Sequence, residues 1–205
     1  MPPLLLLASR SPRRAELLQQ IGVPFTAVDS DTDETTRDGE SLHDYVLRVA
    51  CNKAHAARHT ATSTNIVLAA DTAGECLGKR LVKPTDETHA LDILMRMSGQ
   101  VHTVSTAVCV LSCADNQMHS CVVNTAVHFR TLTREECRRY WQTGEPHDKA
   151  GAYAIQGYGG IFVERLEGSY SGVVGLPLFE TARLLQRVGI HPWQHTVPVR
   201  KPESP

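Results

Sequence analysis

Residues 4–22 have the sequence LLLLASRSPRRAELLQQIG, and this stretch predicts the fold class. The unbroken apolar run Leu4–Ala8 is typical of a strand that is buried on both faces. A helix is predicted to begin at Pro12, which has no amide hydrogen and so suits a first turn, with Ser11 as its N-cap. Gly22 is a typical helix end. A buried strand, a tight turn and a helix in succession favour an α/β protein.

The rest of the chain mixes helices and strands without strict alternation. Further helices are expected after the N-caps Ser41 and Thr85, between Thr133 and Gly144, and after Pro177. Strands are expected at 66–70, 152–155 and 161–166, with a long hairpin over 100–130 that turns at 114–116. We therefore predict a mixed, twisted sheet flanked by helices, in a single α/β domain over residues 1–189. Residues 190–205 are rich in proline and polar residues and are expected to form a flexible tail.

Composition and charge exclude several classes of function. The 205 residues carry 21 Lys and Arg against 22 Asp and Glu, a net charge of −1, so no basic field is available to bind a nucleic acid polymer. The apolar run near the start is too short to span a membrane. The six cysteines form no C-x-x-C pair, which favours reduced thiols in the cytoplasm over a disulfide framework or a structural zinc site. P-loop, Rossmann and H-E-x-x-H motifs are not found.

The turn before the first helix is a candidate phosphate site. The start of a helix has unpaired amides and the positive end of the helix dipole, which repels a cation by about 0.3–1 kcal/mol. Arg13 and Arg14 are therefore poorly placed there unless an anion joins them. A phosphate would meet backbone amides, serine hydroxyls and two guanidinium groups at once. The alternative is an ordinary solvated helix start that happens to be basic.

Acidic residues form two further candidates. Asp71 follows the strand expected at 66–70, at the sheet edge where α/β proteins bind ligands, and a carboxylate there suits a general base or a metal ligand. Asp31, Asp33 and Glu34 offer the hard oxygen atoms that suit Mg²⁺ or Mn²⁺ when a substrate phosphate completes the shell. Taken alone, Asp71 is equally well explained as a turn or N-cap residue, and the other three as an acidic surface loop.

Two lysines and a glutamine are weaker candidates. Lys53 is expected one position off the apolar stripe of its helix, and Lys83 lies in the extended segment before Pro84; either is also consistent with a surface lysine. Gln156 lies in GAYAIQG at 151–157, and its amide offers a donor and an acceptor that suit the edge of a nucleotide base. The alternative there is a strand end with turn glycines.

In order along the chain, these segments resemble one family. The segments that carry the resemblance are LLLASRSPRRAELLQQIGVPF, DTDET, YVLRVACNKA, VLAADT, LVKP, MSGQVHTVSTAV, GEPHDKAGAYAIQGYGG and GSYSGVVGLPLFET. Over about residues 4–188 the chain resembles the Maf family of nucleotide pyrophosphatases, and AYAIQG resembles the branch that hydrolyses dTTP and UTP. The resemblance implies a mixed α/β fold of the Maf/inosine-triphosphatase type with a cleft between two lobes. It also implies a cytoplasmic homodimer that uses a divalent cation, Mg²⁺ or Mn²⁺.

The resemblance also implies roles for individual residues. Asp71 matches the proposed proton acceptor, and Glu34 matches a residue that helps to hold the metal. The residues that match the triphosphate site are Ser9, Arg13, Arg14, Lys53 and Lys83. Those that match positions associated with substrate choice are Arg13, Thr72 and Gln156. The chain departs from the family pattern at Arg10, where a small residue is often found, and at 73–76, where apolar residues usually follow.

These roles predict a reaction. Asp71 is expected to activate water, directly or through the metal, for in-line attack on the α-phosphorus of dTTP or UTP, so that pyrophosphate leaves and the nucleoside monophosphate remains. Two alternatives stay open. One is a regulator, for example of cell division, that binds nucleotides without turnover, and the other is a pyrophosphatase for a modified purine triphosphate.

Overall fold

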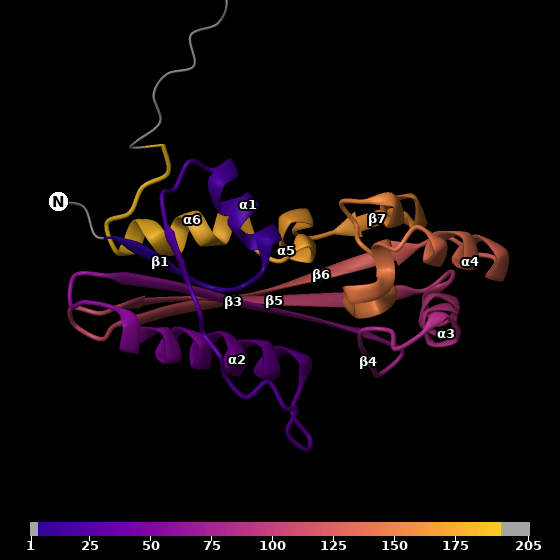
Figure 1. Ribbon diagram of the computed structural model, residues 1–205, viewed down its shortest axis with the longest axis horizontal. Coiled ribbons are helices and arrows are strands. Elements are labelled where there is room, and N and C mark those ends of the chain that lie inside the picture. Colours follow the sequence, from indigo (N-terminus) through magenta and orange to yellow (C-terminus); the bar gives the residue numbers. More distant parts are fainter. Residues whose placement is uncertain (1–3, 194–205) are drawn as a thin grey trace, which may run out of the picture.

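The computed structural model describes residues 4–193, and in this part of the chain seven strands form one mixed sheet (Figure 1). The strands are β1 (Leu5–Ala8), β2 (Thr26–Val28), β3 (Ile66–Cys76), β4 (Lys79–Leu81), β5 (Val101–Ser112), β6 (Met118–Phe129) and β7 (Val163–Glu167). Their order is β2-β1-β3-β5-β6-β7, with β4 paired to β3. Strand β1 runs parallel to β2 and β3, and the other pairs are antiparallel. The predicted mixed α/β sheet is confirmed.

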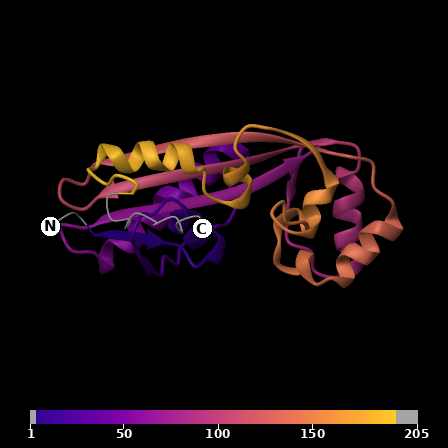
Figure 2. The same ribbon diagram turned by 90° about the horizontal axis from the view of Figure 1, so that it is seen from above.

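Helices cover both faces of this sheet. They are α1 (Pro12–Gln20), α2 (Leu42–Ala57), α3 (Glu87–Met97), α4 (Arg134–Gln142), α5 (Tyr170–Val174) and α6 (Leu178–Arg187). Helix α2 lies on one face and α1, α5 and α6 on the other, while α3 and α4 gather at the far end of the long strands (Figures 1 and 2). Three apolar clusters follow this arrangement: one under α2, one under α1 and α6, and one between α3, α4 and the strand ends. The third cluster is the core of a second lobe. This agrees with the two lobes that the family resemblance implies.

Several predicted boundaries agree with the structure because local caps set them. Helix α1 begins at Pro12, as expected. Ser41 caps α2, its hydroxyl accepting the amide hydrogen of Asp44 at 3.1 Å. Thr133 and Glu136 form the full capping box of α4. The long hairpin is also present, as β5 and β6.

Three predictions about local structure were wrong. Strand β3 does not end at residue 70 but continues to Cys76, because β5 pairs with it from Ile66 to Glu75 and β4 pairs with its end. Asp86, and not Thr85, caps α3, its carboxylate accepting the amide hydrogen of His89 at 2.9 Å. Residues 152–155 are not a strand, because the chain turns into the left-handed region at Gly151 (φ 78°) and Ala152 (φ 55°).

The end of this segment also differs from expectation. Residues Tyr158–Phe162 form a 3₁₀ helix, so the strand expected at 161–166 begins only at Val163. Strands β2 and β4 were not predicted, since three residues are too few to show a period. Helix α5, of five residues, was missed for the same reason.

The C-terminal part packs onto the sheet as far as Ile190, which is buried beside α6 in the same cluster as β1. The tail expected at 190–205 falls, from residue 194 onward, outside the described residues. No helix within residues 4–193 is long and apolar enough to cross a membrane. All six cysteines lie in the described part, where they form no disulfide, and their reduced state stays a prediction.

The core position of β1 yields a stability prediction. Leu7 is fully buried, whereas Leu4, one residue before the strand, is 53% exposed. We expect Leu7→Ala to lower the free energy of unfolding by about 2–5 kcal/mol, through lost transfer energy and the cavity left behind. Leu4→Ala, the matched control, is expected to change it by less than about 1 kcal/mol. Urea unfolding followed by circular dichroism measures both; equal effects would contradict the assignment of Leu7 to the core.

Candidate active site

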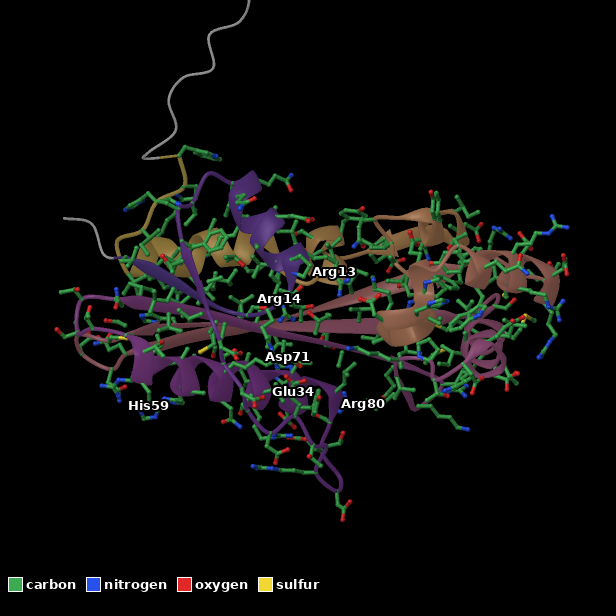
Figure 3. All side chains as sticks on the ribbon, viewed as in Figure 1. Arg13, Arg14, Glu34, His59, Asp71 and Arg80 are labelled. Carbon is green, nitrogen blue, oxygen red and sulfur yellow. The ribbon has the colours of Figure 1, made fainter. Side chains whose placement is uncertain are left out.

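A cleft of about 440 Å³ opens where the two lobes meet. Its walls come from segments far apart in the chain: the start of α1, the loop at Glu34, α2, the middle of β3, the segment after β4, residues 148–156 and the end of α5. Almost every residue singled out from the sequence lines it: Arg13, Arg14, Glu34, Lys53, Asp71, Thr72, Lys83 and Gln156. Ser9 lies beside it and hydrogen-bonds to Arg14. Figure 3 shows Arg13, Arg14, Asp71 and Glu34 gathered between α1 and α2.

An ion pair between α2 and β3 lies at the base of the cleft. The Lys53 Nζ lies 2.7 Å from Asp71 Oδ1 and 2.8 Å from Glu34 Oε1, so one ammonium bridges two carboxylates. Lys53 and Asp71 are buried, whereas the Glu34 side chain is 53% exposed. The prediction that Lys53 lies one position off the apolar stripe of its helix was wrong. Lys53 belongs to the buried stripe, together with Val49 and Ala50. Paired with Asp71, a buried lysine is tolerated there.

The surroundings of Asp71 change its proton affinity. Burial raises the pKa of Asp71, while the nearby charges of Lys53 and Arg14 partly oppose that rise. A carboxylate with a raised pKa is a better proton acceptor, and the cations that face it favour its charged form. Asp71 is therefore suited to acid–base chemistry.

Arg14 is fixed in place by three parts of the chain. Its Nε donates to Gly175 O at 2.9 Å, its Nη1 to Ser9 Oγ at 3.3 Å and its Nη2 to Thr72 Oγ1 at 3.3 Å. The hydroxyl of Thr106, which the sequence analysis missed, lies 2.9 Å from Thr72 Oγ1 and 2.7 Å from Gly172 O, so it ties this network to α5. The guanidinium group is thus oriented before any ligand arrives.

The start of α1 remains available to a ligand. Ser11 is at the N-cap position, as predicted, but its side chain makes no capping hydrogen bond. No side chain therefore caps the first turn, and its residues Pro12, Arg13 and Arg14 line the cleft. Unpaired amides beside two guanidinium groups suit a phosphate.

The acidic loop contributes fewer residues to the cleft than its composition suggested. Of its three candidates only Glu34 lines the cleft. Asp31 is 3.9 Å from Arg10 Nη2 at the surface, and Asp33 accepts the amide hydrogen of Thr35 at 2.8 Å. Within residues 4–193 no group of three or more His, Cys, Asp and Glu side chains could hold a metal. Glu34 and Asp71 together still fit Mg²⁺ or Mn²⁺, which bind through one or two carboxylates when phosphate oxygens supply the other ligands.

Gln156 lies on a turn, and the segment directly after it is held by the side chain of Glu145. The Glu145 carboxylate accepts the amide hydrogens of Tyr158 and Gly159, both at 2.9 Å, and the hydroxyl of Tyr140 at 2.6 Å. A Cβ at Gly157 would come within 2.0 Å of Glu145 Oε2, so a side chain there would displace the Glu145 carboxylate from these hydrogen bonds. Glu145 was not identified from the sequence, because nothing in GEPHD shows which backbone its carboxylate reaches.

The fold and the cleft together define a class: an α/β enzyme that binds a phosphate chain between two lobes. The chain belongs to the Maf-like protein family, whose family model matches residues 4–188. It is 50% identical over 190 residues to the dTTP/UTP pyrophosphatase of Pseudoalteromonas atlantica, covering 91% of this chain and 98% of that protein. It is also 50% identical over 182 residues to the dTTP/UTP pyrophosphatase of Vibrio parahaemolyticus, covering 89% of this chain and 95% of the relative. Among solved structures, a nucleoside-triphosphatase (dITP/XTP pyrophosphatase) from Mycobacterium abscessus aligns with a TM-score of 0.40 at 15% identity, over 62% of this chain and 75% of that one.

The ion pair yields a prediction about titration. In the wild-type protein the Asp71 carboxyl is expected to titrate above the ordinary range of an aspartate, because burial raises its pKa. Lys53→Met removes the nearest positive charge, so the pKa of Asp71 should rise further. Carbon-13 NMR of the Asp71 side-chain carboxyl measures both values. Lys79→Met, on exposed β4, is the control; an unchanged Asp71 titration in Lys53→Met would contradict the pairing.

Proposed function

We propose that this protein hydrolyses dTTP and UTP between the α- and β-phosphates, releasing pyrophosphate and the nucleoside monophosphate. The observation that carries the proposal is the Asp71 carboxylate, 2.7 Å from Lys53 Nζ, in one cleft with Arg13, Arg14 and Lys83. That arrangement provides a base and a cationic site for a polyphosphate together. The names of relatives that are about half identical over nearly the whole chain support the choice of substrate.

The cations of the cleft compensate the negative charge of the substrate. A nucleoside triphosphate carries about four negative charges, which repel an attacking oxygen and must be compensated before the reaction. Arg14 is held by Ser9, Thr72 and Gly175, so binding phosphate requires little reorganisation of its side chain. Arg13 and the first-turn amides of α1 would bind the same phosphate chain from the same side.

A divalent cation, Mg²⁺ or Mn²⁺, would be held by Glu34 and Asp71 together with substrate oxygens. When bound, it would neutralise phosphate charge and polarise the phosphorus centre. Both carboxylates share Lys53 in the free protein, at 2.8 and 2.7 Å. Lys53 therefore holds the two acidic groups close together until substrate arrives.

In the reaction Asp71 accepts a proton from water, and the water oxygen attacks the α-phosphorus in line with the departing group. The bond from the α-phosphorus to the bridging oxygen breaks, and that oxygen leaves with pyrophosphate. Lys83 and the arginines are placed to stabilise the charge that develops on the leaving group. No covalent intermediate on the protein is needed.

Substrate choice would reside on the opposite side of the cleft. The Gln156 amide can donate to O4 and accept from N3–H of uracil or thymine, which share that edge. Thr72 contacts Arg14 and Thr106, so we infer that it acts on substrate choice through the orientation of Arg14. Arg13 lines the same cleft and completes the set associated with substrate choice.

Two further features remain predictions. We expect the protein to act in the cytoplasm, where its substrates are found. We also expect it to form a homodimer, as the family resemblance implies. Analytical ultracentrifugation of the full chain tests the second expectation.

The role of Asp71 is testable by removing its basicity. Asp71→Asn keeps the shape of the side chain, so nucleotide should still bind, but pyrophosphate release from UTP should fall by about 10²-fold or more. A coupled pyrophosphate assay with Mg²⁺ or Mn²⁺ measures the rate, and calorimetry measures binding. Asp38→Asn, on the exposed acidic loop, is the matched control. Near-normal turnover by Asp71→Asn would exclude the role proposed, and binding without turnover in the wild type would favour a regulator.

Base selection gives a second test. We expect Gln156→Ala to reduce the preference for dTTP and UTP over dCTP and GTP, because the side-chain amide that distinguishes the base edge is lost. The ratios of kcat/KM across the four nucleotides measure it. Gln142→Ala, an exposed glutamine at the end of α4, should leave all the ratios unchanged. If Gln156→Ala keeps the original ratios, another residue selects the base.

A further inference from the structure

Lys149 is a cation of the cleft wall to which no role has been assigned. It lies in the second lobe, directly after the 3₁₀ helix Glu145–Asp148, and both Asp148 and Lys149 line the cleft. The Lys149 side chain is 19% exposed, and its ammonium contacts the carboxylate of Asp148, whose side chain is 71% exposed. A mostly buried cation is thus held by a mostly solvated anion.

The pair faces the proposed phosphate site. The Lys149 ammonium lowers the pKa of Asp148, and the Arg13 guanidinium on α1, which lines the same cleft, adds to this effect. In the free protein an anion, the Asp148 carboxylate, already pairs with the Lys149 ammonium at the cleft wall. A bound phosphate chain would compete with that anion for the same positive charges.

The backbone beneath Lys149 is fixed, so its position is a property of the fold. The Gly151 amide donates to Val82 O at 3.0 Å, which joins this segment to the residue before Lys83. The Lys149 carbonyl accepts the amide hydrogen of Ala152 at 3.0 Å. Gly151 has φ +78°, and a Cβ there would come within 3.3 Å of Leu81. Lys149 and Lys83 are therefore brought to the same wall of the cleft.

We propose that Lys149 binds the phosphate chain of the substrate from the second lobe, exchanging the Asp148 carboxylate for phosphate oxygens. The proposal rests on the proposed function for the nature of the ligand. A phosphate chain offers the ammonium more negative charge than one carboxylate does, and the solvated Asp148 loses little when it is released into water. Asp148 then acts as an internal competitor that is displaced when substrate binds.

This exchange predicts opposite effects for two adjacent substitutions. Binding of inorganic tripolyphosphate to the full-length protein, measured by titration calorimetry with Mg²⁺ present, should weaken about tenfold or more in Lys149→Gln. It should strengthen about threefold in Asp148→Asn, because the competing negative charge is gone. Lys149→Arg should bind within about threefold of the wild type. Lys79→Gln, on β4 outside the cleft, should bind as the wild type does.

A disturbed fold would not give this pattern. If Lys149 served only to hold its loop, both substitutions would weaken tripolyphosphate binding, and that outcome would overturn the proposal, as would unchanged binding in Lys149→Gln. Direct binding of uridine, which has no phosphate, should be equal in all variants, and thermal melting verifies that each is folded. Because the titration requires no turnover, its result is distinct from failure of the proposed function, which would appear as wild-type protein that releases no pyrophosphate from UTP or dTTP.

Discussion

The buried ion pair between Lys53 and Asp71 is the interaction on which the site depends. Removing two charges from water costs several kcal/mol each, and only close pairing offsets that cost. Lys53 lies on the buried face of α2 and Asp71 in the middle of β3, so the helix and the sheet must meet at this point. The same contact positions a carboxylate of raised pKa at the base of the cleft. The same two residues therefore join α2 to β3 and form the base of the proposed active site.

Long strands allow two lobes to share one cleft. Strands β3 and β5 pair over ten residues, from Ile66 to Glu75, and reach from the core beneath α2 to the core beside α3. Arg14 joins the start of α1 to β3 and to the end of α5 through Thr72 and Gly175. The side of the cleft proposed to bind phosphate is thus built mainly on the first lobe. Because its cations are held by the fold, little order has to be created when a charged ligand binds.

The second lobe contributes residues of a different kind. Gln156 is on a turn that is closed by the Gly157 amide and the Ala154 carbonyl at 3.2 Å, and the Glu145 carboxylate stabilises the segment just after it by accepting two amide hydrogens. Lys149 is on the neighbouring segment, where Gly151 takes a left-handed conformation so that the backbone can lie against β4. Irregular backbone brings these side chains to the cleft, since a strand would direct alternate residues away from it.

The sequence by itself determined the features whose cause is local. The apolar run of β1, Pro12 at the start of α1, the cap at Ser41 and the capping box of α4 act within a few residues, so pattern and spacing predict them. The continuation of β3 past Asp71 was not predictable in this way, because it depends on pairing with β5, about 35 residues along the chain. The environment of Lys53 and the place of Lys149 likewise depend on segments distant in sequence. Only the tertiary structure decides such features, because burial and charge pairing are set by neighbours in space.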